Sequence, residues 1–125
     1  MFREETYEVL REHGVTMAWS EIPYVDTPPV ITASKIYLRL VGDRSIPEEK
    51  LGKTQRDRTA EISRWVERLK AAAPAIAEGV TFVNNHFQGF APDTVNLVRK
   101  QLGLEPVNWF SSWKDPRSGS QNTLF

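Results

Sequence analysis

Apolar side chains recur along this chain at two different spacings, one typical of helices and one typical of strands. The clearest helical pattern covers residues 57–73. Its apolar positions are three and four residues apart and form a single stripe that faces a core: Ile62, Trp65, Val66 and Leu69. Two shorter helices are predicted. One covers residues 2–13 and is followed by Gly14 as its C-terminal stop, and the other lies between Pro92 and Gly103.

Short runs rich in β-branched and aromatic residues predict three strands between these helices. The runs are residues 15–22, 35–42 and 79–85, and residues 35–42 have the clearest strand composition. Residues 23–30 and 43–56 carry prolines and polar side chains, so they are interpreted as loops. Because strands and helices alternate, the sequence predicts an α/β fold in which helices cover a parallel sheet.

A sheet of three parallel strands leaves two edges open and one face poorly covered. The length of 125 residues allows one domain at most. The pattern therefore indicates that the chain is part of something larger.

Composition excludes several functional classes. Sixteen basic and 16 acidic residues balance to a formal net charge of zero, so the chain offers no strong field to nucleic acid or to an anionic membrane. The absence of cysteine removes disulfides, thiol catalysis and thiolate metal sites. No apolar run approaches the ~18 residues of a membrane span, and the charged N-terminal segment is not a signal peptide. We therefore expect a soluble cytoplasmic protein that binds neither membranes nor nucleic acid directly.

Four segments in fixed order resemble the domain-of-unknown-function-72 family, also called YecE-like. They are AWSEIP, KIYLRLVGDRSIP, GKTQRDRTAEISRWVERL and FVNNHFQGFAPDTVNLVRKQLG, and the resemblance covers roughly residues 2–104. It implies a TIM barrel in which these segments form the sixth strand, the seventh strand with its helix, and the eighth strand with the final helix.

A complete (β/α)8 barrel of this kind takes about 250 residues. We therefore expect residues 1–113 to form a partial barrel, about the last three βα units with parallel strands. A separate N-terminal barrel half, or self-association of this chain, would be its partner.

Arg39 is a candidate ligand-binding residue because of its place on the second predicted strand. Side chains alternate along a strand, so Arg39 shares one face with Tyr37, whereas the apolar residues beside them face the helices. Arg39 would then point into the barrel, where a charge needs a partner or an anionic ligand. Glu21 and Asp43 are the candidate partners, and a buried structural ion pair is the alternative to ligand binding.

The stretch VNNHFQGF supplies further candidates at the end of the last predicted strand. Asn84, Asn85 and His86 end this strand, and Gly89 lies in the loop before the final helix. Free backbone amides at this place commonly bind phosphate in TIM barrels, so we expect a small anionic, phosphate-bearing ligand. The alternative is that the asparagines satisfy loop backbone groups and that Gly89 serves only the turn.

The resemblance brings no reaction with it, and whether the protein is an enzyme stays open. Glu21 and Asp43 are candidate catalytic carboxylates, since either could act as a general acid or base if buried. The charged residues 55–58 could clamp a phosphate or could be a solvated helix start with local ion pairs. His13 and His86 lack the spacing of metal ligands, and no nucleotide-binding loop is present, so neither a metal nor a cofactor is expected.

Residues 114–125 are interpreted as a flexible tail because they are rich in Ser, Gly and Pro. The tail ends in QNTLF, which resembles the short peptide by which many DNA-metabolism proteins dock on the bacterial sliding clamp. Leu124 and Phe125 would fill an apolar pocket, and Gln121 would hydrogen-bond at its rim. A non-catalytic module that docks on the clamp is therefore an alternative function, and a truncated remnant without activity is another.

The docking hypothesis predicts that a labelled SGSQNTLF peptide binds the sliding clamp of the source organism. Roughly micromolar affinity is expected, because ordering a flexible peptide costs part of the binding free energy. A peptide in which Leu124 and Phe125 are changed to alanine should lose this binding in fluorescence anisotropy titrations. Equal binding by both peptides, or none by either, would remove the hypothesis.

Overall fold

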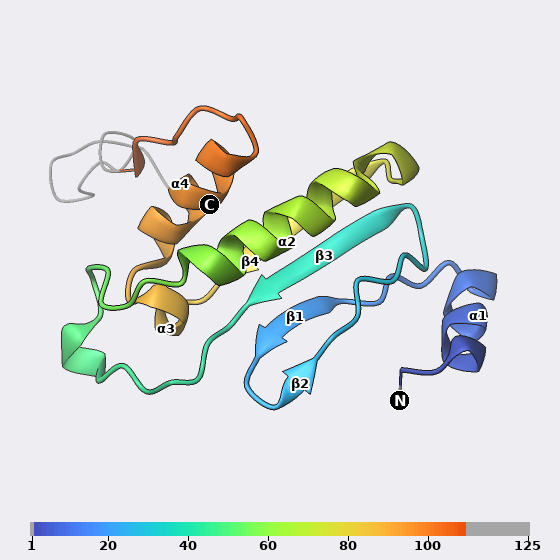
Figure 1. Ribbon diagram of the computed structural model, residues 1–125, viewed down its shortest axis with the longest axis horizontal. Helices are drawn as coiled ribbons and strands as arrows, with labels where there is room; N and C mark the ends of the chain where they lie inside the picture. The colour runs from blue at the N-terminus through green and yellow to red at the C-terminus, as the bar shows by residue number, and fades with distance from the viewer. Residues whose placement is uncertain (1, 110–125) are drawn as a thin grey trace, which may run out of the picture.

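A four-stranded sheet forms the centre of the computed structural model, which describes residues 2–109 (Figure 1). The strand order is β2-β1-β3-β4, where β1, β3 and β4 are parallel and β2 is antiparallel to β1. The strands are β1 (Trp19–Ile22), β2 (Val25–Asp26), β3 (Lys35–Leu40) and β4 (Glu78–Val83). The helices are α1 (Glu4–Glu12), α2 (Thr59–Ala72), α3 (Asn85–Gln88) and α4 (Ala91–Gln101), with short 3₁₀ turns at Glu48–Lys50 and Ala73–Ala75.

The predicted α/β class with parallel strands is confirmed in this part of the chain. β3 is followed by α2, and α2 leads into β4, which is the order expected when a helix crosses between two parallel strands. The tail over residues 114–125, with Gln121, Leu124 and Phe125, lies outside the described residues, so the docking motif stays a prediction.

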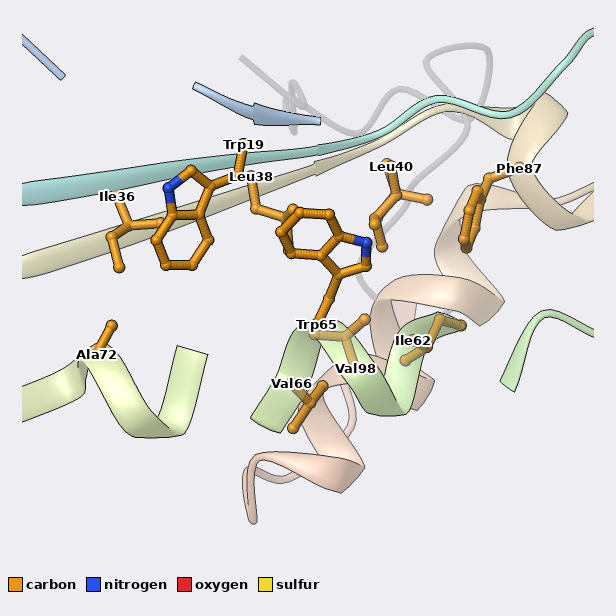
Figure 2. Packing of buried hydrophobic residues seen from close by; sticks show 11 residues of the cluster. Trp19, Ile36, Leu38, Leu40, Ile62, Trp65, Val66, Ala72, Phe87 and Val98 are labelled. Carbon is orange, nitrogen blue, oxygen red and sulfur yellow. The ribbon is translucent and has the colours of Figure 1, made fainter. Parts of the chain in front are cut away.

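The central strand β3 separates two environments by strict alternation. Its side chains are alternately exposed and buried along all six positions. The buried set, which faces α2 and α4, consists of Ile36, Leu38 and Leu40 (Figure 2). The exposed set consists of Lys35, Tyr37 and Arg39. The predicted orientation of Arg39, away from the helices, is therefore confirmed.

Two tryptophans form the centre of the core between β1 and α2. The ring centroids of Trp19 and Trp65 are 6.0 Å apart, and only 1% of Trp19 and 2% of Trp65 is exposed (Figure 2). Both indole nitrogens find acceptors, as buried tryptophans usually do: that of Trp19 donates to the Val30 carbonyl oxygen at 3.0 Å, and that of Trp65 donates to the Glu21 carboxylate. The predicted core position of Trp65 is thus confirmed.

The first predicted strand is shorter in the structure than in the sequence pattern. Its first four positions lie outside β1, and a side chain satisfies two of the backbone groups in this segment. The Thr32 hydroxyl donates to the Val15 carbonyl oxygen at 2.7 Å and accepts from the Met17 amide at 2.8 Å. The Val15 carbonyl and the Met17 amide therefore need no hydrogen bonds from a neighbouring strand.

Two short elements were not predicted. The segment interpreted as a loop over residues 23–30 contains β2, which forms a hairpin with β1 through the Pro23–Tyr24 turn. The residues after β4 form α3, which Asn84 caps by accepting a hydrogen bond from the His86 amide. Both elements depend on local turn geometry, which periodicity does not report.

The helix-free face of the sheet carries apolar side chains without a cover in the part of the chain that the structure describes. Tyr37 is 38% exposed, and Val80 and Phe82 are each 47% exposed. Tyr37 and Val80 are register partners in neighbouring strands, so they form one patch.

No helix among residues 2–109 is both long and apolar enough to cross a membrane.

The exposed patch predicts that the isolated chain self-associates, because an uncovered apolar sheet face recruits other chains. Val80→Lys should weaken this association by about tenfold or more, since burial of one valine is worth ~1.5–3 kcal/mol. Sedimentation velocity at several concentrations measures the change. Val9→Lys on α1 is the matched control, because Val9 is similarly exposed at 55% and lies away from the sheet. An equal effect of both substitutions, or a wild-type chain that stays monomeric, would contradict the prediction.

Candidate functional site

The carboxyl ends of the three parallel strands lie level with one another and border a pocket. Glu21 of β1 is the register partner of Leu40 in β3, which in turn is the partner of Val83 in β4. The pocket has a volume of about 220 Å³. It is lined by Glu21, Ile22, Pro23, Gly42, Asp43, Arg58 and Phe87. Ligand sites of open parallel sheets lie at this end of the strands, so the pocket is the first candidate.

Two glycines allow the loops at this end of the sheet to approach one another closely. Gly42, after β3, has a φ of +83°, and a Cβ there would lie 2.5 Å from the carbonyl oxygen of His86. Gly89, after α3, has a φ of +122°, and a Cβ there would collide with the carbonyl oxygen of Lys53. Only glycine fits such positions without strain. Gly89 is therefore required by the packing of its turn against the loop at residues 53–55.

Asp43 is held in its ionised form by a dense set of donors. Its carboxylate accepts hydrogen bonds from the hydroxyl and, at 3.0 Å, from the amide of Ser45. Arg56 and Arg58 approach the same carboxylate at 3.2 and 3.5 Å. The Ser45 hydroxyl, then the Ser45 amide, and to a smaller extent the two guanidinium groups lower the pKa of Asp43 to about 2. At neutral pH, Asp43 can act as an acceptor or a base, but it has no proton to donate as an acid.

Arg58 connects the loop after β3 to the helix after β4. Its Nε donates to the Phe87 carbonyl oxygen at 2.8 Å, and its guanidinium carbon lies 5.4 Å from the centroid of the Phe87 ring. The same side chain approaches Asp43 and, at 3.9 Å, Glu61. Residues 55–58 thus include the local ion pairs that were the alternative to a phosphate clamp. The contact between Arg58 and Phe87 spans 29 residues, and no signal in the sequence indicated it.

Glu21 points toward the helices rather than into the helix-free face. Its Oε2 accepts from Arg64 at 2.7 Å and also from the indole nitrogen of Trp65. Glu21 and Asp43, the two candidate catalytic carboxylates, nevertheless border the same pocket. Neither of them pairs with Arg39, so the expected ion pair is not formed by these residues.

Arg39 lies on the helix-free face, near the carboxyl end of β3. Its register partners are Ser20 in β1 and Phe82 in β4, so it projects from the middle of the parallel sheet. No acceptor lies within hydrogen-bond distance of its guanidinium among residues 2–109. Five donors thus remain available for a group from outside this part of the chain.

The predicted strand includes Asn84 and Asn85, but both asparagines follow β4 in the structure and use their side-chain oxygens within the chain. Asn84 accepts from the His86 amide, and Asn85 accepts from the Ala91 amide, both at 2.8 Å. These bonds close the turns that lead into α3 and α4, which was the structural alternative to ligand binding. The Nδ1 atom of His86 is buried and has no partner within the described residues. Asn84, Asn85, His86 and Gly89 are not among the residues that line the 220 Å³ pocket.

The donor set offers no centre for a metal ion in the part of the chain that the structure describes. No group of three or more histidine, aspartate and glutamate side chains is close enough there to hold a metal ion.

The causes of the low pKa of Asp43 predict the effect of removing its neighbours. Ser45→Ala should raise this pKa by more than Arg56→Gln does, because the Ser45 hydroxyl contributes most to lowering it. NMR titration of the Asp43 carboxyl carbon between pH 1.5 and 6 measures both shifts.

The lowered pKa of Asp43 also makes the stability of the fold depend on pH. The pKa of Asp43 in the folded protein lies below its ordinary value of 3.8, so the contribution of its ionised form to stability is present above pH 3.8 and is lost as the pH falls toward 2. In urea unfolding, Ser45→Ala should reduce the loss of stability over this window. A larger pKa change in Arg56→Gln than in Ser45→Ala would contradict the assignment.

Comparisons with known proteins agree on one family. A family model described as protein of unknown function DUF72 matches residues 1–119. The structure is similar to that of a DUF72 family protein from Thermotoga maritima MSB8, with a TM-score of 0.57 and 25% identity over 78% of this chain and 40% of that chain. Two structures of a DUF72 family protein from Enterococcus faecalis V583 match with TM-scores of 0.60 and 0.65.

The Enterococcus faecalis structures are 18% identical to this chain, and they match 82% of it and 42% and 43% of their own length. This chain therefore spans about two fifths of the length of the solved proteins that it resembles. A search of the curated proteins found no match. Because the family model covers residues 1–119 of 125, this chain belongs to the DUF72 family of proteins of unknown function.

Proposed function

We propose that this chain supplies the last three βα units of a (β/α)8 barrel and binds a small, phosphate-bearing anion at the carboxyl ends of its strands. The fold supports the first part of the proposal. Three parallel strands have helices on one face, and alternate side chains of β3 are exposed on the other. In a closed barrel the helix-free face is the interior, which is filled by side chains from all the strands.

The exposed edge of β4 and the helix-free patch identify the surface that the remaining strands would cover. β4 is the last strand in the sheet order, so one of its edges has no strand beside it among residues 2–109. In a complete barrel the eighth strand pairs with the first, which would satisfy these backbone groups. Tyr37, Val80 and Phe82 would then be buried inside the barrel.

The observation that carries the ligand proposal is the unmatched guanidinium of Arg39. Three other arginines at this end of the sheet are engaged: Arg58 and Arg56 with Asp43, and Arg64 with Glu21. Arg39 has no such partner within the described residues and lies on the prospective interior face. A charge enclosed there would be costly without a counter-charge, and a phosphate or carboxylate fits the planar fork of an arginine.

The neighbouring carboxylates do not prevent anion binding. Asp43 and Glu21 are both held by guanidinium groups, so little of their negative charge is left unbalanced at the strand ends. Ser20 lies beside Arg39 in the sheet register and adds a hydroxyl that can donate to an anion. The ligand would therefore be anchored from the sheet itself.

Phosphate titration of the full chain tests this proposal. Arg39→Gln should weaken binding of inorganic phosphate by about tenfold or more, since hydrogen bonds to charged groups are worth ~1.5–3 kcal/mol. Chemical-shift titration by NMR measures the affinity, and circular dichroism should show an unchanged melting curve because Arg39 is exposed.

Lys35→Gln is the matched control for this titration. Lys35 lies on the same face of the same strand as Arg39 but at its other end, where it pairs with Glu78 at 3.5 Å. We expect phosphate affinity within about twofold of wild type for this variant, because a single surface charge contributes little. Unchanged phosphate binding by Arg39→Gln, or equal losses in both variants, would overturn the proposal.

A further inference from the structure

The strand β4 has a backbone edge without a neighbouring strand in the part of the chain that the structure describes. β3 lies along its other edge, where the Asn84 amide donates to the Leu40 carbonyl oxygen at 2.9 Å. Because successive residues of a strand turn their backbone groups to opposite edges, the amides and carbonyls of Gly79, Thr81 and Val83 point to the free edge. Each of these three residues therefore has one donor and one acceptor available for another strand.

The free edge of β4 lacks the charges and prolines that usually prevent edge strands from pairing. Residues 79–83 contain neither a charged side chain nor a proline. Val80 and Phe82 are each 47% exposed and follow the helix-free face. At the opposite edge of the sheet, β2 already pairs with the carboxyl end of β1. Association by strand pairing is therefore directed to β4.

We propose that two copies of this chain form a symmetric dimer in which their β4 strands pair antiparallel, with Thr81 on the two-fold axis. In this register Gly79 of each copy lies opposite Val83 of the other, so all three outward-facing residues exchange hydrogen bonds. A register shifted by two residues sets Gly79 or Val83 against a residue outside β4. The inference goes beyond the proposed function, because it does not use the anion site.

The same register brings the exposed apolar side chains together. Val80 of one copy lies directly opposite Phe82 of the other, and an aromatic side chain beside a β-branched one is a favourable cross-strand pair. The two-fold axis repeats this pair, and Tyr37 extends the cluster because it is the register partner of Val80 in β3. Glu78, the charged residue of β4, lies opposite Asn84 of the other copy, so the two strands bring no like charges together.

The helix-covered face leaves room for the second copy in this arrangement. Gly79 is exposed on that face, whereas Val83 is buried in the same core cluster as Val98 of α4. The two-fold axis places the open end of one strand beside the covered end of the other. The two Val83 residues are then four residues apart, or roughly 14 Å along the strands, which exceeds the spacing of about 8–10 Å between packed helices.

The dimer and a closed barrel use the same edge of β4. In a barrel the first strand pairs there, so a polypeptide that carries the missing strands has to displace the second copy. Both copies contribute the same surface to a two-fold interface, so the association stops at a dimer and does not continue into a filament.

Disulfide formation between introduced cysteines tests this register in the full chain, which has no cysteine of its own. Val80→Cys and Phe82→Cys are prepared separately, mixed in equal amounts and oxidised, and intact-mass spectrometry identifies the covalent dimers. Opposite residues have Cα atoms ~4.5 Å apart, within the range that a disulfide spans, whereas two copies of the same position lie on a diagonal of ~7–8 Å. We expect the mixed disulfide to exceed each homodisulfide by about tenfold, and the mixed dimer keeps one native contact between Val80 and Phe82.

Val9→Cys mixed with Phe82→Cys is the control for random collision, because Val9 is 55% exposed and lies on α1. Sedimentation velocity of the wild-type chain should show a dimer. A monomeric wild type would overturn the inference, and so would a mixed disulfide that is no more abundant than in the control or no more than about twofold above each homodisulfide, the ratio that random pairing gives. None of these readouts uses a ligand, so their failure would leave the proposed phosphate site unaffected.

Discussion

The structure depends on the two-residue alternation of β3. One set of its side chains packs against α2 and α4, and the other set projects from the helix-free face. A shift of one residue would exchange the two sets, so the register with β1 and β4 is fixed by burial. The same alternation places Leu38 in the core with the Trp19–Trp65 pair and Arg39 on the open face. Fold and proposed ligand site are therefore two consequences of one strand.

The sequence predicted those features that periodicity and composition control. The apolar stripe of α2 and the composition of β3 both correspond to observed elements, and the direction of Arg39 followed from strand alternation. The pattern over residues 15–18 predicted a strand, whereas the structure has none there. The sequence does not reveal that the Thr32 hydroxyl satisfies backbone groups of this segment. β2 escaped prediction because a two-residue strand has no period to detect, and its turn depends on a positive φ at Tyr24.

The sequence predicted where the candidate site lies, but it did not predict which residues contact one another there. Strand ends identified Glu21 and Asp43, and both residues border the observed pocket. Their partners could not be foreseen, because Arg64 is 43 residues from Glu21 and Arg56 is 13 residues from Asp43. Contacts of this kind follow from how helices and loops pack, whereas a single sequence reports mainly local preferences.

The close approach at Gly42 restricts which parts of this end of the sheet can change shape. The backbone after β3 touches the backbone at His86, and Arg58, the residue that precedes α2, contacts both regions through Asp43 and Phe87. The two loops are therefore expected to move together, because a movement of either loop alone would break its contact with the other. The β1–β2 hairpin has no comparable restraint at its tip, where Tyr24 is fully exposed. Movements that open the carboxyl ends of the strands, and sequence changes that alter ligand recognition there, would therefore be concentrated in the β1–β2 hairpin. The loops after β3 and β4 would keep their positions.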